Sequence, residues 1–190
     1  AAYAVGLRPG MDDKGLIKVL RNEDTVGMTA AQASAFADKY EVAAPTFTTD
    51  SGLQINVFRD KATRQEYFVI AGSNEVINDI IIADIGHIAV GKIPTGQMID
   101  AINYYYRVTT PKGKPAPQIR LDSEDVETVD EFGETISLPV PRIVAAPPVY
   151  GDGLISSNAV IDGNHSLAGL IAVGLGRVTG AEALSTVNAP

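Results

Sequence analysis

The stretch from Ala159 to Val173 constrains this chain most, because it sets a short apolar run, a turn and a small-residue run in direct succession. The spacing predicts a strand, a tight turn and a helix. Ser166 lies where the turn meets the helix, next to backbone N–H groups that have no partner inside the helix. A strained turn of this kind can present a serine hydroxyl as a nucleophile.

This stretch resembles the nucleophile elbow of α/β-hydrolase lipases, which usually has the sequence Gly-His-Ser-Leu-Gly-Gly. Phe68 to Glu75 is similar to the family's strand and oxyanion turn, Val76 to Ile80 to the Asp-containing stretch after it, and Leu184 to Pro190 to the strand after the nucleophile helix. These landmarks have the family's order. The likeness covers roughly residues 40 to 190 and is closest to lipase-like domains of large bacterial secreted proteins with calcium-binding repeats.

The resemblance implies a catalytic role for Ser166 and an acyl ester as substrate. It implies that backbone N–H groups of Leu167 and of Gly72 or Ser73 form the oxyanion hole. The alternative for residues 72–74 is a plain turn and helix cap. The implied fold is a three-layer α/β-hydrolase-like domain over residues 1–190, with a mixed or mainly parallel sheet, and the implied location is secreted or on a bacterial cell surface.

The elbow departs from the family's sequence at its small residues. Either Asn164 replaces the first glycine, or Asn164 is an insertion and Gly163 is that glycine displaced by one residue. Ala168 stands where a later glycine is expected. Glycine is used in such a turn because a Cβ would crowd the adjacent strand and helix. The turn either survives these changes or is an elbow without a working serine.

The chain does not supply a complete triad in the family's order of serine, acid and histidine. After Ser166 it offers Glu182 as the only carboxylate and no histidine, and its two histidines are His87 and His165. We therefore expect one of two cases. The chain is the N-terminal portion of a longer hydrolase, lacking the C-terminal strands, inactive alone and paired with a complementary C-terminal segment or another copy. Otherwise it is a degenerate hydrolase scaffold that serves as a binding or structural module.

Composition narrows the classes of partner. The formal net charge of −8 and the pI near 4.7 argue against binding to a phosphate backbone, so nucleic acid is not an expected partner. The absence of cysteine excludes disulfides, thiolate metal sites and cysteine nucleophiles. No apolar run approaches the roughly 18 residues that a membrane span needs. We expect no cofactor and no metal site.

Local patterns predict several further elements. Thr29 and Gln32 predict a capping box that opens a helix to about Tyr40. Alternating apolar residues around a polar turn at residues 60–64 predict an antiparallel hairpin with strands near residues 53–57 and 67–70. Residues 76–92, which include His87, and residues 97–108 have helical spacing. Residues 15–20 are compatible with a strand or a short helix.

Residues 110–158 differ from the rest of the chain. Prolines interrupt them, and the segment from Asp122 to Glu134 has seven carboxylates and no basic residue. Oxygen ligands of this kind attract calcium, but the spacing is not that of an EF-hand or of a calcium-binding nonapeptide repeat. We therefore expect a solvated surface insertion, with a calcium site as the weaker alternative. In a lipase-like scaffold such an insertion would act as a lid or an interaction loop.

Overall fold

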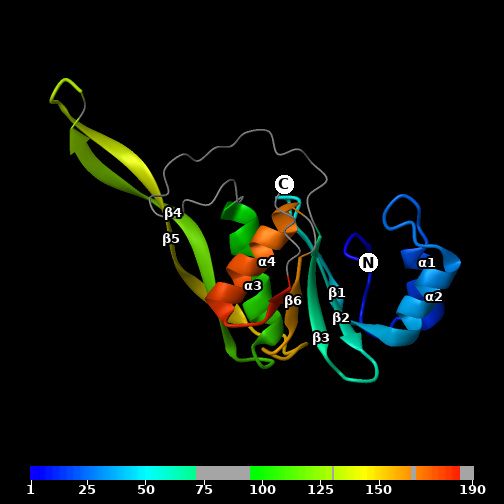
Figure 1. Cartoon of the computed structure of the whole chain (residues 1–190). Coiled ribbons are helices and arrows are strands. Elements are labelled where there is room, and N and C mark those ends of the chain that lie inside the picture. Colours follow the sequence, from blue (N-terminus) through cyan, green and yellow to red (C-terminus); the bar gives the residue numbers. More distant parts are fainter. Residues whose placement is uncertain (72–94, 130, 164–165, 185–190) are drawn as a thin grey trace.

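The computed structural model describes residues 1–71, 95–129, 131–163 and 166–184 (Figure 1). Its central element is a mixed sheet with the strand order β1-β2-β3-β6-β7. The strands are β1 (Tyr40–Thr48), β2 (Gln54–Asp60), β3 (Glu66–Ala71), β6 (Val160–Asp162) and β7 (Ala183–Leu184). β1, β2 and β3 are antiparallel neighbours, whereas β3, β6 and β7 run parallel. The expected class of mixed α and β structure with a mixed sheet is confirmed.

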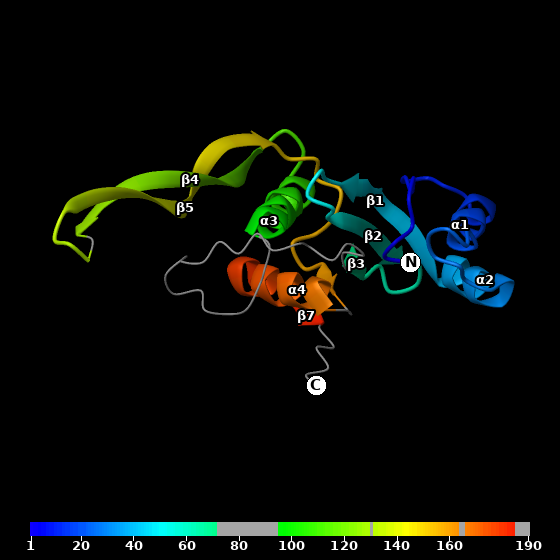
Figure 2. The same cartoon turned by 90° about the horizontal axis from the view of Figure 1, so that it is seen from above.

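Helices cover both faces of this sheet, so that the molecule has three layers (Figure 2). α1 (Asp13–Leu20) and α2 (Ala30–Lys39) lie on one side, and α3 (Thr95–Thr109) and α4 (Ser166–Thr179) lie on the other. Each side has its own apolar core. Neighbouring residues of β2 serve different cores, because Val57 faces α3 and α4 while Phe58 faces α1 and α2.

The β2–β3 hairpin confirms the strands predicted for residues 53–57 and 67–70. Its register pairs Gln54 with Ala71 and Arg59 with Glu66. In the turn, the Asp60 carboxylate accepts hydrogen bonds from the N–H groups of Ala62 at 2.8 Å and Thr63 at 2.9 Å. These bonds stabilise the ionised form and lower the pKa of Asp60. Polar turn residues thus fix the register of the strand that leads to the predicted oxyanion turn.

The helix starts follow the capping rules. The Thr29 hydroxyl accepts a hydrogen bond from the Gln32 N–H at 3.3 Å, and the Gln32 side chain accepts one from the Thr29 N–H at 3.0 Å. This reciprocal pair is the predicted capping box of α2. Residues 15–20, for which strand and helix were both compatible, lie in α1, which Asp12 caps by accepting from the Gly15 N–H. The helix predicted for residues 97–108 is α3.

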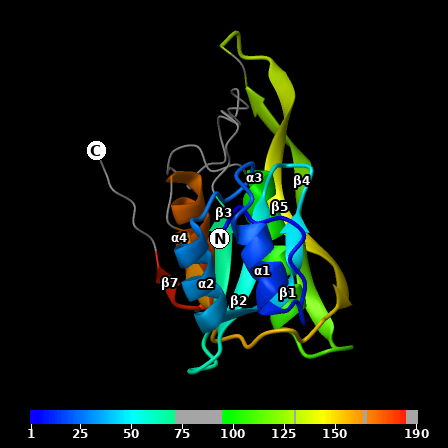
Figure 3. The ribbon, with the colours of Figure 1, turned by 90° about the vertical axis from the view of Figure 1, so that its right-hand side faces the viewer.

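Most of the segment 110–158, for which we expected a solvated surface insertion, forms two long paired strands. β4 (Pro115–Val129) and β5 (Thr135–Tyr150) pair as an antiparallel hairpin that projects away from the three layers (Figure 3). Asn103 of α3 anchors its base, since the Asn103 side chain exchanges two hydrogen bonds of 2.8 Å with the backbone of Ile119. Most of the hairpin is exposed to solvent.

Candidate functional site

The predicted nucleophile lies at the carboxyl edge of the parallel strands. β6 ends at Asp162, and the backbone of Ser166 begins α4 only a few residues later. β6 pairs in parallel with β3, in a register that matches Asp162 with Val69, so the two strands end at the same edge of the sheet. α4 then packs back on β3 and β6. The predicted strand and helix are thus present on either side of residues 164–165, which lie outside the described residues.

Gly163 is the residue of this turn at which a side chain does not fit. An added Cβ would overlap the Ala168 carbonyl oxygen and would lie 2.6 Å from the Ala168 carbonyl carbon and 2.8 Å from the Ala172 Cβ. The missing side chain therefore lets β6 and α4 approach closely. Ala168, which stands where the resemblance implies a glycine, is buried.

Small residues also set the position of α4. A Cβ on Gly174 would lie 2.5 Å from the Met98 Cε of α3, and a Cβ on Gly176 would lie 2.8 Å from the Ala183 Cβ of β7. The glycines of α4 thus allow close contact with α3 on one side and β7 on another. Gly163 donates its N–H to the Leu184 carbonyl at 3.1 Å. The Gly163 N–H therefore links the end of β6 to β7, while the glycines of α4 let that helix contact α3 and β7.

Asp162 is a polar residue of this edge that the sequence did not single out. Its Oδ1 is buried and has no hydrogen-bond partner among the described residues. Burial also raises the pKa of Asp162, because the ionised carboxylate loses contact with water. A buried carboxylate oxygen without a partner is costly, so the Asp162 Oδ1, which has none in the described ranges, marks a polar point at this edge.

A partly buried ion pair holds the segment that leads into β6. Arg59 contacts Glu66 with a 2.6 Å bond from Nη2 to Oε1. The second oxygen of Glu66 accepts the Ser156 N–H at 2.5 Å, and Arg59 donates to the Leu154 carbonyl at 3.2 Å. Strands β2 and β3 therefore position the approach to the turn through polar contacts that join distant parts of the sequence.

Other predicted site residues lie outside the described residues. These are Gly72 and Ser73 of the proposed oxyanion turn, both histidines, Asn164 and the helix expected over residues 76–92. Leu167 is the second residue of α4, so its backbone is part of the helix start. Within the described ranges, no group of three or more His, Cys, Asp or Glu residues could hold a metal ion.

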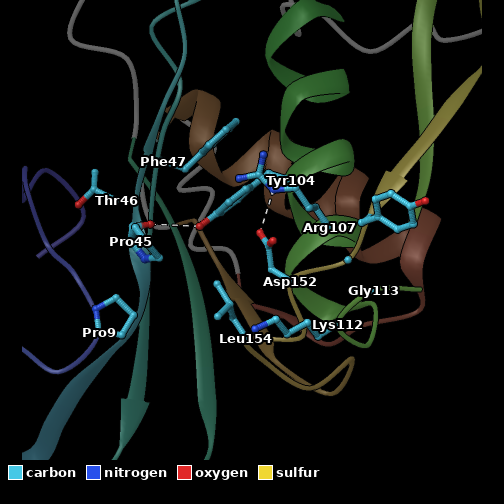
Figure 4. A pocket seen from close by; sticks show the side chains of 12 residues that line it. Pro9, Pro45, Thr46, Phe47, Tyr104, Arg107, Lys112, Gly113, Asp152 and Leu154 are labelled. Atoms are coloured by element: carbon cyan, nitrogen blue, oxygen red, sulfur yellow. Dashed lines mark hydrogen bonds and ion pairs between the residues drawn. The ribbon is translucent and has the colours of Figure 1, made fainter. Parts of the chain in front are cut away.

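A separate cavity of about 630 Å³ lies between β1, α3 and the base of the β4–β5 hairpin (Figure 4). Its residues are Pro9, Pro45, Thr46, Phe47, Tyr104, Arg107, Lys112, Gly113, Tyr150, Gly151, Asp152 and Leu154. None of them comes from β3, β6 or α4. The cavity is therefore distinct from the edge at which Ser166 lies.

Stacked aromatic rings form one wall of this cavity. Phe47 and Tyr104 lie parallel, with ring centroids 4.1 Å apart, and the Arg107 guanidinium lies 5.2 Å from the Tyr104 centroid. Arg107 Nε is 3.1 Å from Asp152 Oδ2, an ion pair whose angle is not that of a hydrogen bond. The Tyr104 hydroxyl donates to the Pro45 carbonyl at 3.1 Å. Burial raises the pKa of Tyr104 to about 12, so this hydroxyl stays protonated near neutrality.

The aromatic and cationic lining suits a small ligand with a flat apolar part. Sequence patterns did not reveal this cavity, because its residues come from four distant segments.

No helix among the described ones is both long and apolar enough to span a membrane. Compared with protein-family models, curated proteins and solved structures, the chain matches none of them.

Proposed function

We propose that this chain is the nucleophile-bearing portion of a lipase-like or esterase-like serine hydrolase that acts on uncharged acyl esters. The observation that carries the proposal is the close contact of Gly163, at the end of a parallel strand, with the helix that begins at Ser166. That contact lies at the strand edge shared with β3, after which the proposed oxyanion turn follows in the sequence. The α/β-hydrolase arrangement itself is part of this proposal.

In the proposed reaction, the Ser166 hydroxyl attacks the ester carbonyl and gives its proton to a histidine. The carbonyl oxygen becomes an oxyanion that the N–H groups of Leu167 and of Gly72 or Ser73 hold. The alcohol then leaves with that proton, and water releases the acid from Ser166 by the same route. No histidine follows Ser166 in the sequence, so we expect the base and its acid partner to be supplied from outside residues 1–190.

Labelling with a fluorophosphonate tests this proposal. The longest natural form of the protein that contains this chain should react at Ser166, as mapped by peptide mass spectrometry, and the Ser166→Ala variant should not. The isolated chain should hydrolyse p-nitrophenyl butyrate no faster than its own Ser166→Ala variant. Absence of labelling in the long form would overturn the proposal. Ser166-dependent hydrolysis by residues 1–190 alone would overturn the external base.

The second candidate function is a degenerate hydrolase scaffold that serves as a binding or structural module of a larger surface or secreted protein. The cavity between β1, α3 and the hairpin base favours it, because the cavity uses none of the residues of the serine edge. Binding of a flat ligand there, together with silence of Ser166 towards the fluorophosphonate, would support the module over the enzyme.

A further inference from the structure

The β4–β5 hairpin is a ribbon of two strands that reaches well beyond both apolar cores (Figures 1 and 3). In the described part of the chain, each of its strands pairs only with the other. An isolated two-stranded hairpin is marginally stable in water, and its outer edges offer unpaired backbone groups. The hairpin is therefore a surface to which a further strand can be added.

The two edges of the hairpin are not equivalent. Pro139 and Pro141 of β5 lie opposite Asp125 and Ser123. Because proline has no N–H, these pairs occupy positions at which the two strands do not bond to each other, so the N–H groups of Ser123 and Asp125 point to the outer edge of β4. The Ser123 N–H accordingly donates to the Asp122 side chain at 3.0 Å rather than across the ladder. Pro139 and Pro141 thus offer no N–H donor on the outer edge of β5, whereas β4 contains no proline between Gln118 and Val129.

Around Val126, the two faces of the hairpin carry different side chains. On one face Val126 lies opposite Leu138, beside Val140, and these side chains are 43%, 48% and 38% exposed. On the other face β4 carries Asp125 and Glu127. Since successive residues of a strand point to opposite faces, a third strand beside β4 would meet the exposed Val126 and the ion-paired Glu124 on one face, and Asp125 and Glu127 on the other.

The net negative charge of the hairpin favours a basic partner. Residues 115–150 have seven carboxylates and two arginines, which is −5 of the formal net charge of −8. Both arginines are neutralised within the hairpin, Arg120 by Asp122 at 3.1 Å and Arg142 by Glu124. In the described ranges, Asp125 and Glu127 take part in no ion pair. A second copy of this chain would bring like charges together, whereas a basic strand would meet unpaired carboxylates.

We propose that the open edge of β4 binds an extended segment of another protein, in which basic and apolar residues alternate, as a third strand of the hairpin. The apolar side chains of that segment pack against Val126. Its basic side chains lie beside Asp125 and Glu127. Backbone hydrogen bonds to the outward groups of β4 provide the rest of the binding free energy.

A synthetic probe tests the edge directly. A blocked peptide of alternating Lys and Val, about eight residues long, is titrated against the full chain by fluorescence anisotropy. The same peptide with N-methyl groups on alternate residues keeps charge and composition but cannot complete the ladder. The unmodified peptide should bind at least about tenfold more tightly. Equal affinity of the two peptides would show charge attraction alone and overturn the proposal.

Two substitutions at one position separate charge from the backbone donor. Asp125→Asn removes the charge and keeps the N–H, and should lower the affinity for the Lys-Val peptide by about two- to fivefold. Asp125→Pro also removes the outward N–H, and should lower this affinity by about a further tenfold. Equal binding by both variants would contradict edge pairing. The hairpin contributes nothing from residues 120–150 to the described cores, so both variants should keep the wild-type unfolding midpoint.

Two further measurements test whether a second copy of the chain or a lipid surface binds the hairpin instead. Sedimentation velocity should show no growth of a dimer with concentration when Asp125 and Glu127 are intact. Vesicles of phosphatidylcholine should not bind the chain. Self-association through the hairpin, or vesicle binding without peptide binding, would overturn the proposal. None of these readouts depends on Ser166, so the outcome is independent of the proposed hydrolase activity.

Discussion

At the scale of single residues, Gly163 decides how closely strand β6 and helix α4 approach. We expect Gly163→Ala to lower the free energy of unfolding by about 1–3 kcal/mol, because the new Cβ overlaps the Ala168 carbonyl group. Urea unfolding followed by circular dichroism measures the change.

The matched control for this substitution is Gly96→Ala in the first turn of α3, where no described atom lies within 4 Å of the added Cβ. This control should be neutral or should stabilise by about 0.4–1 kcal/mol. If Gly163→Ala behaves like Gly96→Ala, the turn is not closely packed and the support for a strained elbow disappears.

Asp162 carries a second prediction at this scale, which concerns pH. Its pKa is raised by burial above 3.8, so the folded chain binds its proton more tightly than the unfolded chain does. The free energy of unfolding therefore falls as the pH rises from 3.8 through the raised pKa, because the buried carboxyl ionises. Asn cannot ionise, so the Asp162→Asn variant should be more stable than the wild type at neutral pH.

The same comparison below pH 3.8 provides the check. There the carboxyl is protonated in both folded and unfolded chains, so the difference in urea midpoint between Asp162→Asn and the wild type should shrink. A constant difference at both pH values would show that ionisation of Asp162 does not affect stability. A less stable Asn variant at neutral pH would point to an unseen partner of the carboxylate.

At the scale of elements, the capping box of α2 gives a local test. Thr29→Ala removes the hydroxyl that accepts the Gln32 N–H, and should lower the free energy of unfolding by about 1 kcal/mol. Ser34→Ala, an exposed change within the same helix, should have a small or stabilising effect because alanine is the better helix former. Thermal unfolding of both variants distinguishes a cap effect from a general effect on α2.

Elements with short-range signals could be predicted from the sequence, and those set by distant contacts could not. The capping box, the β2–β3 hairpin, and the strand and helix on either side of residues 164–165 depend on neighbouring residues. β1 follows α2 without a break and contains Pro45, so its strand state depends on pairing with β2. β4 and β5 combine carboxylates and prolines, which disfavour strands locally, and only their mutual pairing explains them.

The candidate site shows the same division. Ser166 at a helix start was visible in one short stretch of sequence. The buried Asp162 Oδ1, which has no partner among the described residues, and the ion pair of Arg59 with Glu66 were not, because both depend on which segments the fold brings together. The cavity residues Phe47 and Tyr104 also lie far apart in the sequence and meet only when α3 covers β1.

At the scale of the whole molecule, one part of the chain forms the apolar cores and another part, the β4–β5 hairpin, projects from them. The two apolar cores share the β1–β2–β3 strands and, among the described residues, take none from residues 120–150. The distal hairpin instead carries most of the net negative charge and much of the exposed apolar surface. We therefore expect the layers to fold without it.

Replacing residues 123–141 by Asn-Gly tests this division. The dipeptide forms a tight turn between Asp122 and Arg142, which already lie opposite each other. The free energy of unfolding should stay within about 1 kcal/mol of the wild type, because no core side chain is removed. Binding of the Lys-Val peptide should be lost. A large drop in stability would mean that the hairpin supports the cores, and retained peptide binding would place the docking edge elsewhere in the molecule.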